Sequence, residues 1–250
     1  MKPSHFFALV GAAAALTACN SKQENAASNA PVNLTPVAPP AGGDWTQTVS
    51  LTPEGGFVMG NPNAKVKLIE YGSLTCPHCR EFDETGVEPL VNTYVKSGQV
   101  SWEFRNYVRD AFDLAATLIA RCNGPKSFFP LSRAMYKDQP NWVAKIQAVP
   151  QAQLEGLQNL PSDQVPPTAA GFAGLPQWAA ARGVPEAKSA QCLRDTAQVN
   201  KLVEMNANAT QQYPDFPGTP TFIINGKMFN PNTGSPLWDQ LKVALNGGLG

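Results

Sequence analysis

The sequence predicts an α/β fold in which a helical domain is inserted between two parts of a strand-containing unit. An apolar run at Val66–Tyr71 predicts a buried strand, and alternating apolar and polar residues at Val100–Arg105 predict a half-buried one. A helical segment between them makes a β-α-β unit, whose strands are parallel and whose crossover is right-handed. Helical patterns then fill Asp110 to about Tyr213, before a hairpin signal at residues 221–229.

The composition limits the kinds of partner. The chain has 250 residues, with 19 Lys and Arg balanced by 19 Asp and Glu. Because no basic run occurs, nothing indicates a nucleic-acid partner, and we expect protein partners instead. The length suffices for one large domain or for a domain that carries an insertion.

The N-terminal residues predict export. Residues 1–18 have the form of a signal peptide, because Lys2 precedes an apolar stretch, Phe6–Ala18, that is too short to span a bilayer. Leu16 to Cys19 resemble a bacterial lipobox, in which Cys19 is lipidated. The alternative is an ordinary signal peptide cut within the Ala-rich stretch. Residues 19–45, rich in Asn, Ala, Ser and Pro, predict a lipidated N-terminus and a flexible linker.

Residues 46–108 predict the first part of the α/β domain. Thr46–Leu51 and Phe57–Met59 are candidate strands that precede the two strands of the β-α-β unit. The helix of that unit should run from Pro77 to about Ser97. Pro89 lacks a backbone N–H, so we expect a kink or a break near Glu88.

Residues 109–212 predict the helical domain, and residues 213–250 the second part of the α/β domain. Within the helical domain, the proline-rich stretch Pro140–Pro167 is the least predictable part. In the second part, Asn225 and Gly226 separate two short apolar runs, which is typical of a tight hairpin because both positions adopt positive φ. Pro236 then opens a final helix.

A Cys-x-x-Cys pair lies where the first buried strand runs into a helix. Cys76, Pro77, His78 and Cys79 form it, and Pro77 suits the first helical position. The unpaired N–H groups and the dipole of a helix N-terminus favour a thiolate at Cys76, and cysteines so placed have pKa values of about 3.5–7.5 against about 8.5 when free. We therefore expect Cys76 to be an exposed nucleophile and Cys79 an inward-facing resolving thiol.

Three other uses of such a pair fit less well. A zinc site would need further ligands, but Cys19, Cys122 and Cys192 stand singly and His5 is in the leader. Haem attachment would need His directly after the second Cys, where Arg80 stands. A structural disulfide within one helical turn would brace almost nothing. We therefore expect redox chemistry with no metal and no cofactor.

Together with a downstream segment, the pair carries a family resemblance. The Cys76–Cys79 motif after a strand, followed by Gly218-Thr219-Pro220-Thr221-Phe222 before another strand, resembles the DsbA family of thioredoxin-fold thiol–disulfide oxidoreductases over residues 46–250. The resemblance implies a thioredoxin fold with an inserted helical domain.

The resemblance also implies roles for two residues beside the helix that carries the pair. Pro220 would be the family's cis-proline packed against the sulfurs, with the Thr219 backbone free to pair with a substrate peptide; the alternative is an ordinary proline at a strand start. These two residues are the predicted substrate-binding residues.

Two further residues complete the predicted catalytic set with Cys76, Pro77 and Cys79. Glu70 would be a buried acid that exchanges protons with Cys79, with a pKa raised by desolvation, unless it lies at a solvated strand end. His78 would tune the Cys76 thiolate, unless it points to solvent.

The two remaining cysteines predict a structural disulfide. In an oxidising compartment, Cys122 and Cys192 would close a loop of 70 residues, worth about 4 kcal/mol in the chain-entropy model. The alternative is two separate buried thiols.

The sequence thus predicts a thiol:disulfide oxidoreductase that donates disulfides to exported proteins. Its partners would be reduced or unfolded exported proteins and a membrane partner that reoxidises it, and membrane contact would be by the N-terminal lipid only. We expect it in the periplasm or cell envelope. The alternatives are a reductase or isomerase of the same fold, or a non-catalytic peptide-binding or chaperone module.

Overall fold

The computed structural model describes residues 35–249, so the predicted signal peptide and the predicted lipidation site Cys19 lie outside the described residues. Within these residues, six strands form one sheet, in the order β1-β2-β4-β3-β5-β6. β3 is parallel to β4, and the other neighbouring pairs are antiparallel. The strands are β1 (Val49–Leu51), β2 (Phe57–Gly60), β3 (Val66–Gly72), β4 (Val100–Asn106), β5 (Thr221–Ile224) and β6 (Lys227–Phe229).

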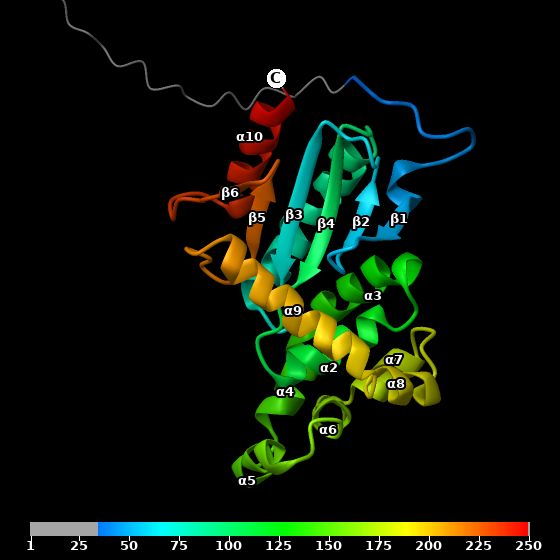
Figure 1. The fold of residues 1–250 in the computed structure, drawn as a ribbon, viewed down its shortest axis with the longest axis vertical. Helices are drawn as coiled ribbons and strands as arrows, with labels where there is room; N and C mark the ends of the chain where they lie inside the picture. Colours follow the sequence, from blue (N-terminus) through cyan, green and yellow to red (C-terminus); the bar gives the residue numbers. More distant parts are fainter. Residues whose placement is uncertain (1–34, 250) are drawn as a thin grey trace, which may run out of the picture.

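Strand β3 is central, as the sequence predicted. It pairs with β4 on one side and β5 on the other, so that Glu70 stands opposite Phe104 and Phe222. In Figure 1, β3 and β4 both point toward the helical domain. The residues that follow β3 therefore emerge where the sheet meets that domain.

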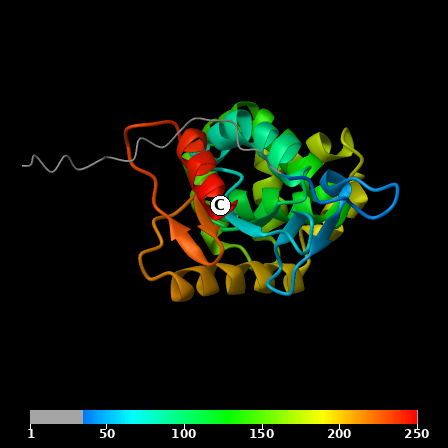
Figure 2. The ribbon, with the colours of Figure 1, turned by 90° about the horizontal axis from the view of Figure 1, so that it is seen from above.

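Helices cover both faces of the sheet (Figure 2). One face carries α1 (Pro77–Phe82) with its continuation and α10 (Leu237–Leu249), and the other carries α9 (Thr196–Gln212). Leu241 and Leu245 of α10 are fully buried, as is Ala209 of α9. The three layers bury an aliphatic and aromatic core, which is what the amphipathic pattern of each helix requires.

The helix after β3 is not broken at Pro89, so of the predicted kink or break the break is wrong. Beyond α1 it continues in wide π-type turns, η2 (Asp83–Val87) and η3 (Leu90–Val95). Glu88 and Pro89 between them keep right-handed helical dihedral angles. Because proline cannot donate to the preceding turn, the helical path widens there instead of ending.

The helical domain lies below the sheet in Figure 1. The prediction of a helical segment is confirmed, and the stretch Pro140–Pro167 contains the rest of one helix, one short helix, a 3-10 turn and the start of another. The elements before α9 are α2 (Ala111–Arg121), α3 (Pro125–Lys137), α4 (Gln139–Gln147), α5 (Gln151–Gly156), η4 (Leu157–Asn159), α6 (Val165–Ala173), α7 (Leu175–Ala180) and α8 (Glu186–Cys192).

Helix α9 ends the predicted helical segment, but it packs on the sheet. The Asn206 side chain donates to the Val108 carbonyl at 2.6 Å and accepts from the Val108 N–H at 3.0 Å, just beyond β4. Leu202 and Met205 are buried on the same side of α9 as Ala209. The helix thus supplies the third layer of the α/β domain rather than a part of the insertion alone.

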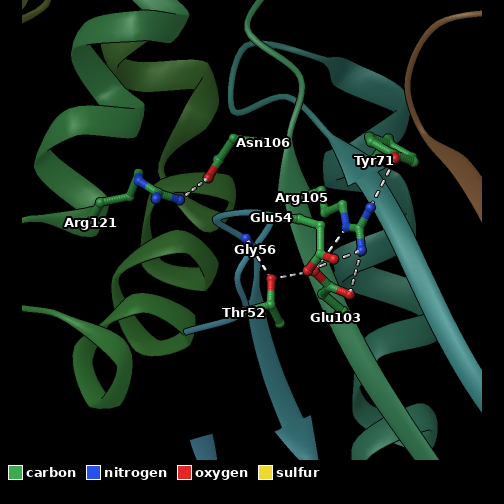
Figure 3. Close-up of polar contacts among 8 residues, drawn as sticks. All are labelled: Thr52, Glu54, Gly56, Tyr71, Glu103, Arg105, Asn106 and Arg121. Carbon is green, nitrogen blue, oxygen red and sulfur yellow. Dashed lines mark hydrogen bonds and ion pairs between the residues drawn. The ribbon is translucent and has the colours of Figure 1, made fainter. Parts of the chain in front are cut away.

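A buried arginine joins the helical domain to the sheet (Figure 3). Arg121 of α2 donates to the side-chain oxygen of Asn106 at 3.1 Å. It also donates to the side-chain oxygen of Gln198 in α9 at 3.1 Å. Its guanidinium also lies 4.7 Å from the ring centre of Phe57 on β2. Burial lowers the pKa of Arg121 to about 10. One side chain of α2 thereby contacts three other elements, β4, α9 and β2, and fixes how the insertion sits on the sheet.

The first predicted strand is shorter than expected. Residues Trp45–Gln47 form a 3-10 turn (η1), and only Val49–Leu51 pairs with β2. The cause is local, because the Asp44 side chain accepts a hydrogen bond from the Thr46 N–H at 2.8 Å and caps the turn.

The end of the predicted linker is attached to the domain. The Val37 N–H donates to the Ser97 carbonyl at 2.8 Å, and the buried Trp45 indole donates to the Val37 carbonyl at 2.8 Å. Ser97 precedes β4, so this contact lies where β3 and β4 begin. The described chain therefore starts at the end of the sheet remote from the residues that follow β3 (Figure 1).

Two further predictions are confirmed. Asn225 and Gly226 join β5 to β6 with positive φ angles of 49° and 82°. Cys122 at the end of α2 and Cys192 at the end of α8 form a disulfide, which closes the loop of 70 residues.

Among residues 35–249, none of the helices has the length and apolarity needed to cross a bilayer.

Candidate active site

The Cys-x-x-Cys pair lies at the start of α1. Cys76 is the N-cap residue, with extended dihedral angles, and Pro77 occupies the first turn. The Arg80 N–H donates to the Cys76 carbonyl at 3.2 Å, which closes the first helical turn. Both thiols are free, so the structure represents the reduced form. The predicted placement of the first sulfur at a helix N-terminus is confirmed.

The Cys76 sulfur is surrounded by hydrogen-bond donors. A hydrogen bond from the Cys79 thiol, together with the backbone N–H groups of Cys79 and His78, lowers the pKa of Cys76 to about 5. Burial acts in the opposite direction and is outweighed. The expected acidity of Cys76 is therefore confirmed, and its cause is direct donation to the sulfur at the helix N-terminus.

The expectation that Cys76 is exposed is wrong. Only 3% of the residue is accessible to solvent. In its protonated form the Cys76 thiol donates to the Thr219 carbonyl oxygen at 3.2 Å, so the segment before β5 lies against the sulfur. A substrate thiolate therefore has to reach a sulfur that is largely shielded from solvent.

Cys79 faces the interior, as predicted, and is fully buried. Burial raises its pKa well above the usual value, and the hydrogen bond to Cys76 and the charges of Cys76 and Glu70 act in the same direction. The pKa of Cys76 is therefore lowered while that of Cys79 is raised, which assigns the thiolate to Cys76.

Glu70 lies on the central strand with 1% of its surface exposed. Burial raises its pKa well above 4.5, and the nearby charge of Asp83 raises it further. The Trp102 indole donates to its carboxyl group at 3.1 Å. The prediction of a buried acid with a raised pKa is confirmed, and the charge of Glu70 is felt at Cys79.

A second buried acid was missed by sequence reasoning. Asp83 follows Cys79 by four residues and so lies on the same face of the helix. Burial raises its pKa to about 6, although Arg133 of α3 lies 3.5 Å from its carboxylate and opposes this shift. The spacing of four residues was the available signal, whereas the Arg133 contact comes from the helical domain.

His78 contacts Cys76 through its backbone and not through its ring. Its N–H is one of the donors to the Cys76 sulfur. The imidazole is largely exposed, and its Nδ1 lies 3.4 Å from the Glu81 carboxylate. The ring therefore follows the alternative weighed above, in which it points to solvent.

The Thr219–Pro220 peptide bond is cis, as predicted. The Thr221 hydroxyl donates to the Gly218 carbonyl at 2.6 Å and holds the turn that precedes β5. The segment thereby presents the Thr219 carbonyl to Cys76.

An ionic cluster supports this segment from the other face of the sheet (Figure 3). Arg105 makes two hydrogen bonds to Glu103, at 2.8 and 3.0 Å, and donates to the Tyr71 hydroxyl at 3.3 Å. The Tyr71 ring then packs edge-on against Phe216, three residues before Thr219.

Within residues 35–249, no group of three or more His, Cys, Asp or Glu side chains is placed to hold a metal ion.

These features define a class of protein. A central strand that leads into a Cys-x-x-Cys helix, with a cis-proline segment against the first sulfur and a helical insertion, is a thioredoxin fold of the DsbA-like kind. A protein-family model described as Thioredoxin matches residues 52–245. The chain belongs to this thioredoxin family.

Comparisons with solved structures agree with this assignment. A protein-disulfide isomerase from Novosphingobium aromaticivorans is 31% identical, with a TM-score of 0.71, over 77% of this chain and 96% of that one. The α-DsbA1 of Wolbachia pipientis is 19% identical, with a TM-score of 0.61, over 80% of this chain and 93% of that one, which shows a shared fold.

Curated relatives are longer than the matched region. A Rickettsia felis protein whose name carries the words protein-disulfide oxidoreductase is 27% identical over 194 residues. The match covers 77% of this chain and 60% of that protein. The chain thus spans about three-fifths of the length of that relative.

Proposed function

We propose that the chain is a thiol:disulfide oxidoreductase that donates the Cys76–Cys79 disulfide to exported proteins. The observation that carries this proposal is the unequal pair of sulfurs, with the pKa of Cys76 lowered to about 5 and that of Cys79 raised. Stabilising the Cys76 thiolate stabilises the reduced enzyme, and a stable reduced form makes the disulfide a stronger oxidant.

The proposed reaction is a pair of exchanges. A substrate thiolate attacks the Cys76 sulfur of the oxidised enzyme, which forms a mixed disulfide and expels Cys79 as a thiolate. Cys79 takes up a proton, for which the buried carboxyl group of Glu70 is the proposed donor. A second substrate thiolate then attacks the substrate sulfur of the mixed disulfide and expels the Cys76 thiolate. Two electrons pass from the substrate to the enzyme.

The site also supports a role for Thr219 and Pro220 in substrate binding. The Thr219 carbonyl already accepts a hydrogen bond from the Cys76 thiol, so a peptide joined to this sulfur would lie beside the Thr219 backbone. Backbone pairing there would hold a substrate without reading its side chains, which suits an enzyme for many unfolded proteins.

The test is a redox titration combined with two assays. The oxidised protein should convert a reduced two-cysteine peptide to its disulfide, and Cys76→Ser should abolish this reaction. A reduction potential well above the value of about −270 mV known for thioredoxin is expected, whereas a value near it would favour a reductase. Full biological activity of Cys76→Ser would instead favour a non-catalytic chaperone module.

An isomerase is a second candidate, because the Novosphingobium protein bears that name. An isomerase would reshuffle a protein with scrambled disulfides when the Cys76 pair is reduced. The oxidase proposal expects slow reshuffling and rapid oxidation of reduced substrates, so the two rates compared on one substrate decide between them.

We further propose that the protein acts in the periplasm or cell envelope and is reoxidised by a membrane partner. The support is the leader of residues 1–18 and the lipobox-like Leu16 to Cys19. Mass spectrometry of the mature N-terminus tests the lipid anchor. A diacylated Cys19 is expected, and a mature chain that starts elsewhere would contradict the anchor.

A further inference from the structure

The loop that precedes Cys76 is held by side chains of the helical domain. Residues 73–75 connect β3 to α1. Their backbone groups form hydrogen bonds with side chains of α2, α3 and α4. The Leu74 N–H donates to the Asp113 carboxylate of α2 at 2.9 Å. The Tyr136 hydroxyl of α3 donates to the Ser73 carbonyl at 3.1 Å.

Gln139, the first residue of α4, bonds to the backbone of Cys76 itself. Its side-chain nitrogen donates to the Leu74 carbonyl at 2.7 Å and to the Cys76 carbonyl at 3.1 Å. Both partners are carbonyl oxygens, which only accept, so the amide nitrogen must face them. The side chain is 4% exposed, and both carbonyls would lack this donor without it.

The position of Gln139 is itself fixed by two tryptophans. The Trp142 indole donates to the Met135 carbonyl at 3.0 Å, across the junction of α3 and α4. The Trp178 indole of α7 donates to the Asp138 carboxylate at 2.8 Å, next to Gln139 in the chain. The amide is therefore presented by a rigid corner of the helical domain and not by a mobile loop.

The two carbonyls set where the Cys76 sulfur lies. The Leu74 carbonyl belongs to the peptide that precedes Thr75, and the Cys76 carbonyl to the peptide between Cys76 and Pro77, so the two bonds orient the backbone before and after the Cys76 side chain. The sulfur must point at the N–H groups of His78 and Cys79 to receive their hydrogen bonds. Hydrogen bonds weaken steeply when their angle departs from linearity, so a modest rotation of these peptides would lose the donors.

We propose that Gln139 is a positioning residue for Cys76, whose amide fixes the Leu74 and Cys76 carbonyls and so holds the sulfur against the N–H groups of α1. Tyr136 assists by holding the Ser73 carbonyl, which also accepts from the Cys76 N–H at 3.2 Å. The inference rests on the proposed redox role of Cys76, and it gives the helical domain a part in setting the reactivity of the thioredoxin site.

The test measures the Cys76 thiolate directly, by its ultraviolet absorbance as a function of pH. Gln139→Met keeps the size of the side chain and removes both donors. It should raise the Cys76 pKa by about 0.5–1 unit, the size of one lost hydrogen bond. The reduction potential should become more negative by about 15–30 mV, since a tenfold change corresponds to about 30 mV.

Two further variants make the outcome decisive. Tyr136→Phe removes only a hydroxyl and should give a smaller rise of the Cys76 pKa in the same direction. Gln147→Met, on the exposed side of the same helix, is the matched control and should leave the pKa and the potential unchanged. A purely structural role of Gln139 would lower the melting temperature without moving the Cys76 pKa.

The proposal is overturned if folded Gln139→Met keeps the wild-type Cys76 pKa. If Gln139→Met does not fold, an unchanged pKa in Tyr136→Phe overturns it. The absorbance measurement needs no turnover. A wild-type protein that fails to oxidise peptides would therefore refute the proposed function and leave the effect of Gln139 on the thiolate to be measured separately.

Discussion

Replacing Cys76 by Ser should change the stability of the reduced protein by an amount that depends on pH. The pKa of Cys76 is about 5 in the folded protein, against 9.0 as its ordinary value. Because the folded pKa is lower, the thiolate contributes stability in full above the ordinary pKa and loses it as the pH falls through about 5. At pH 7 the folded pKa lies two units below the pH and the ordinary pKa lies two units above it. The two units between the folded pKa and the pH correspond to about 3 kcal/mol of stability. Solvent screening reduces this to about 1.5–3 kcal/mol.

The assay is urea unfolding of the reduced wild type and of Cys76→Ser at pH 5 and pH 7. Serine does not titrate in this range, so the difference between the two proteins isolates the Cys76 contribution. Glu70, Asp83 and Asp113 also titrate, but they are present in both proteins, and their contributions cancel except for the part of the Glu70 shift that the Cys76 charge causes. The difference in unfolding free energy should be about 1–2 kcal/mol larger at pH 7 than at pH 5. A difference that stays constant or shrinks with rising pH would refute the assignment of the thiolate to Cys76.

Four other predictions follow from the described contacts. Glu70→Gln should slow the protonation of the Cys79 leaving group by about tenfold or more, measured by stopped-flow fluorescence at pH 7. The same variant should be more stable than the wild type at pH 7. Because the pKa of Glu70 is raised in the folded protein, Glu70 contributes stability below pH 4.5, and that contribution is lost as the pH rises. An equal pH dependence of the unfolding free energy in both proteins would count against this. Cys122→Ser with Cys192→Ser should lose about 4 kcal/mol of stability in urea unfolding, while the reduction potential of Cys76 and Cys79 stays unchanged. Cys76 is 3% exposed, so a bulky maleimide should react with it more slowly than the smaller iodoacetamide does. The ratio of the maleimide rate to the iodoacetamide rate should be at least about tenfold lower than for a cysteine peptide of equal thiolate fraction. Equal ratios for the protein and the peptide would show that the sulfur is open to solvent.

Local patterns predicted the strands and the redox pair well. β3 and β4 follow from an apolar run and from strict alternation, and the hairpin follows from Asn225 and Gly226, because each signal is carried by adjacent residues. The motif around Cys76 likewise contains its own helix start in Pro77. These elements needed no knowledge of distant contacts.

The parts that were missed depend on distant or subtle contacts. Arg133 reaches Asp83 and Gln139 reaches the Cys76 carbonyl only once the helical domain has folded back on α1, and single-sequence periodicity does not encode that. The enclosure of Cys76 likewise comes from Thr219, which lies 143 residues away in the chain. The short β1 is different, because the Asp44 cap was a local signal that the strand prediction overlooked.

The attachment of Val37 to Ser97 gives the molecule a direction. The described chain starts where β3 begins, while Cys76 follows the far end of that seven-residue strand, about 20 Å away. In a lipid-anchored protein, this arrangement would turn the reactive sulfur outward from the bilayer, toward newly exported chains. If a membrane partner reoxidises the domain as proposed above, the end of the sheet that carries Cys76 must turn back toward the bilayer for that reaction.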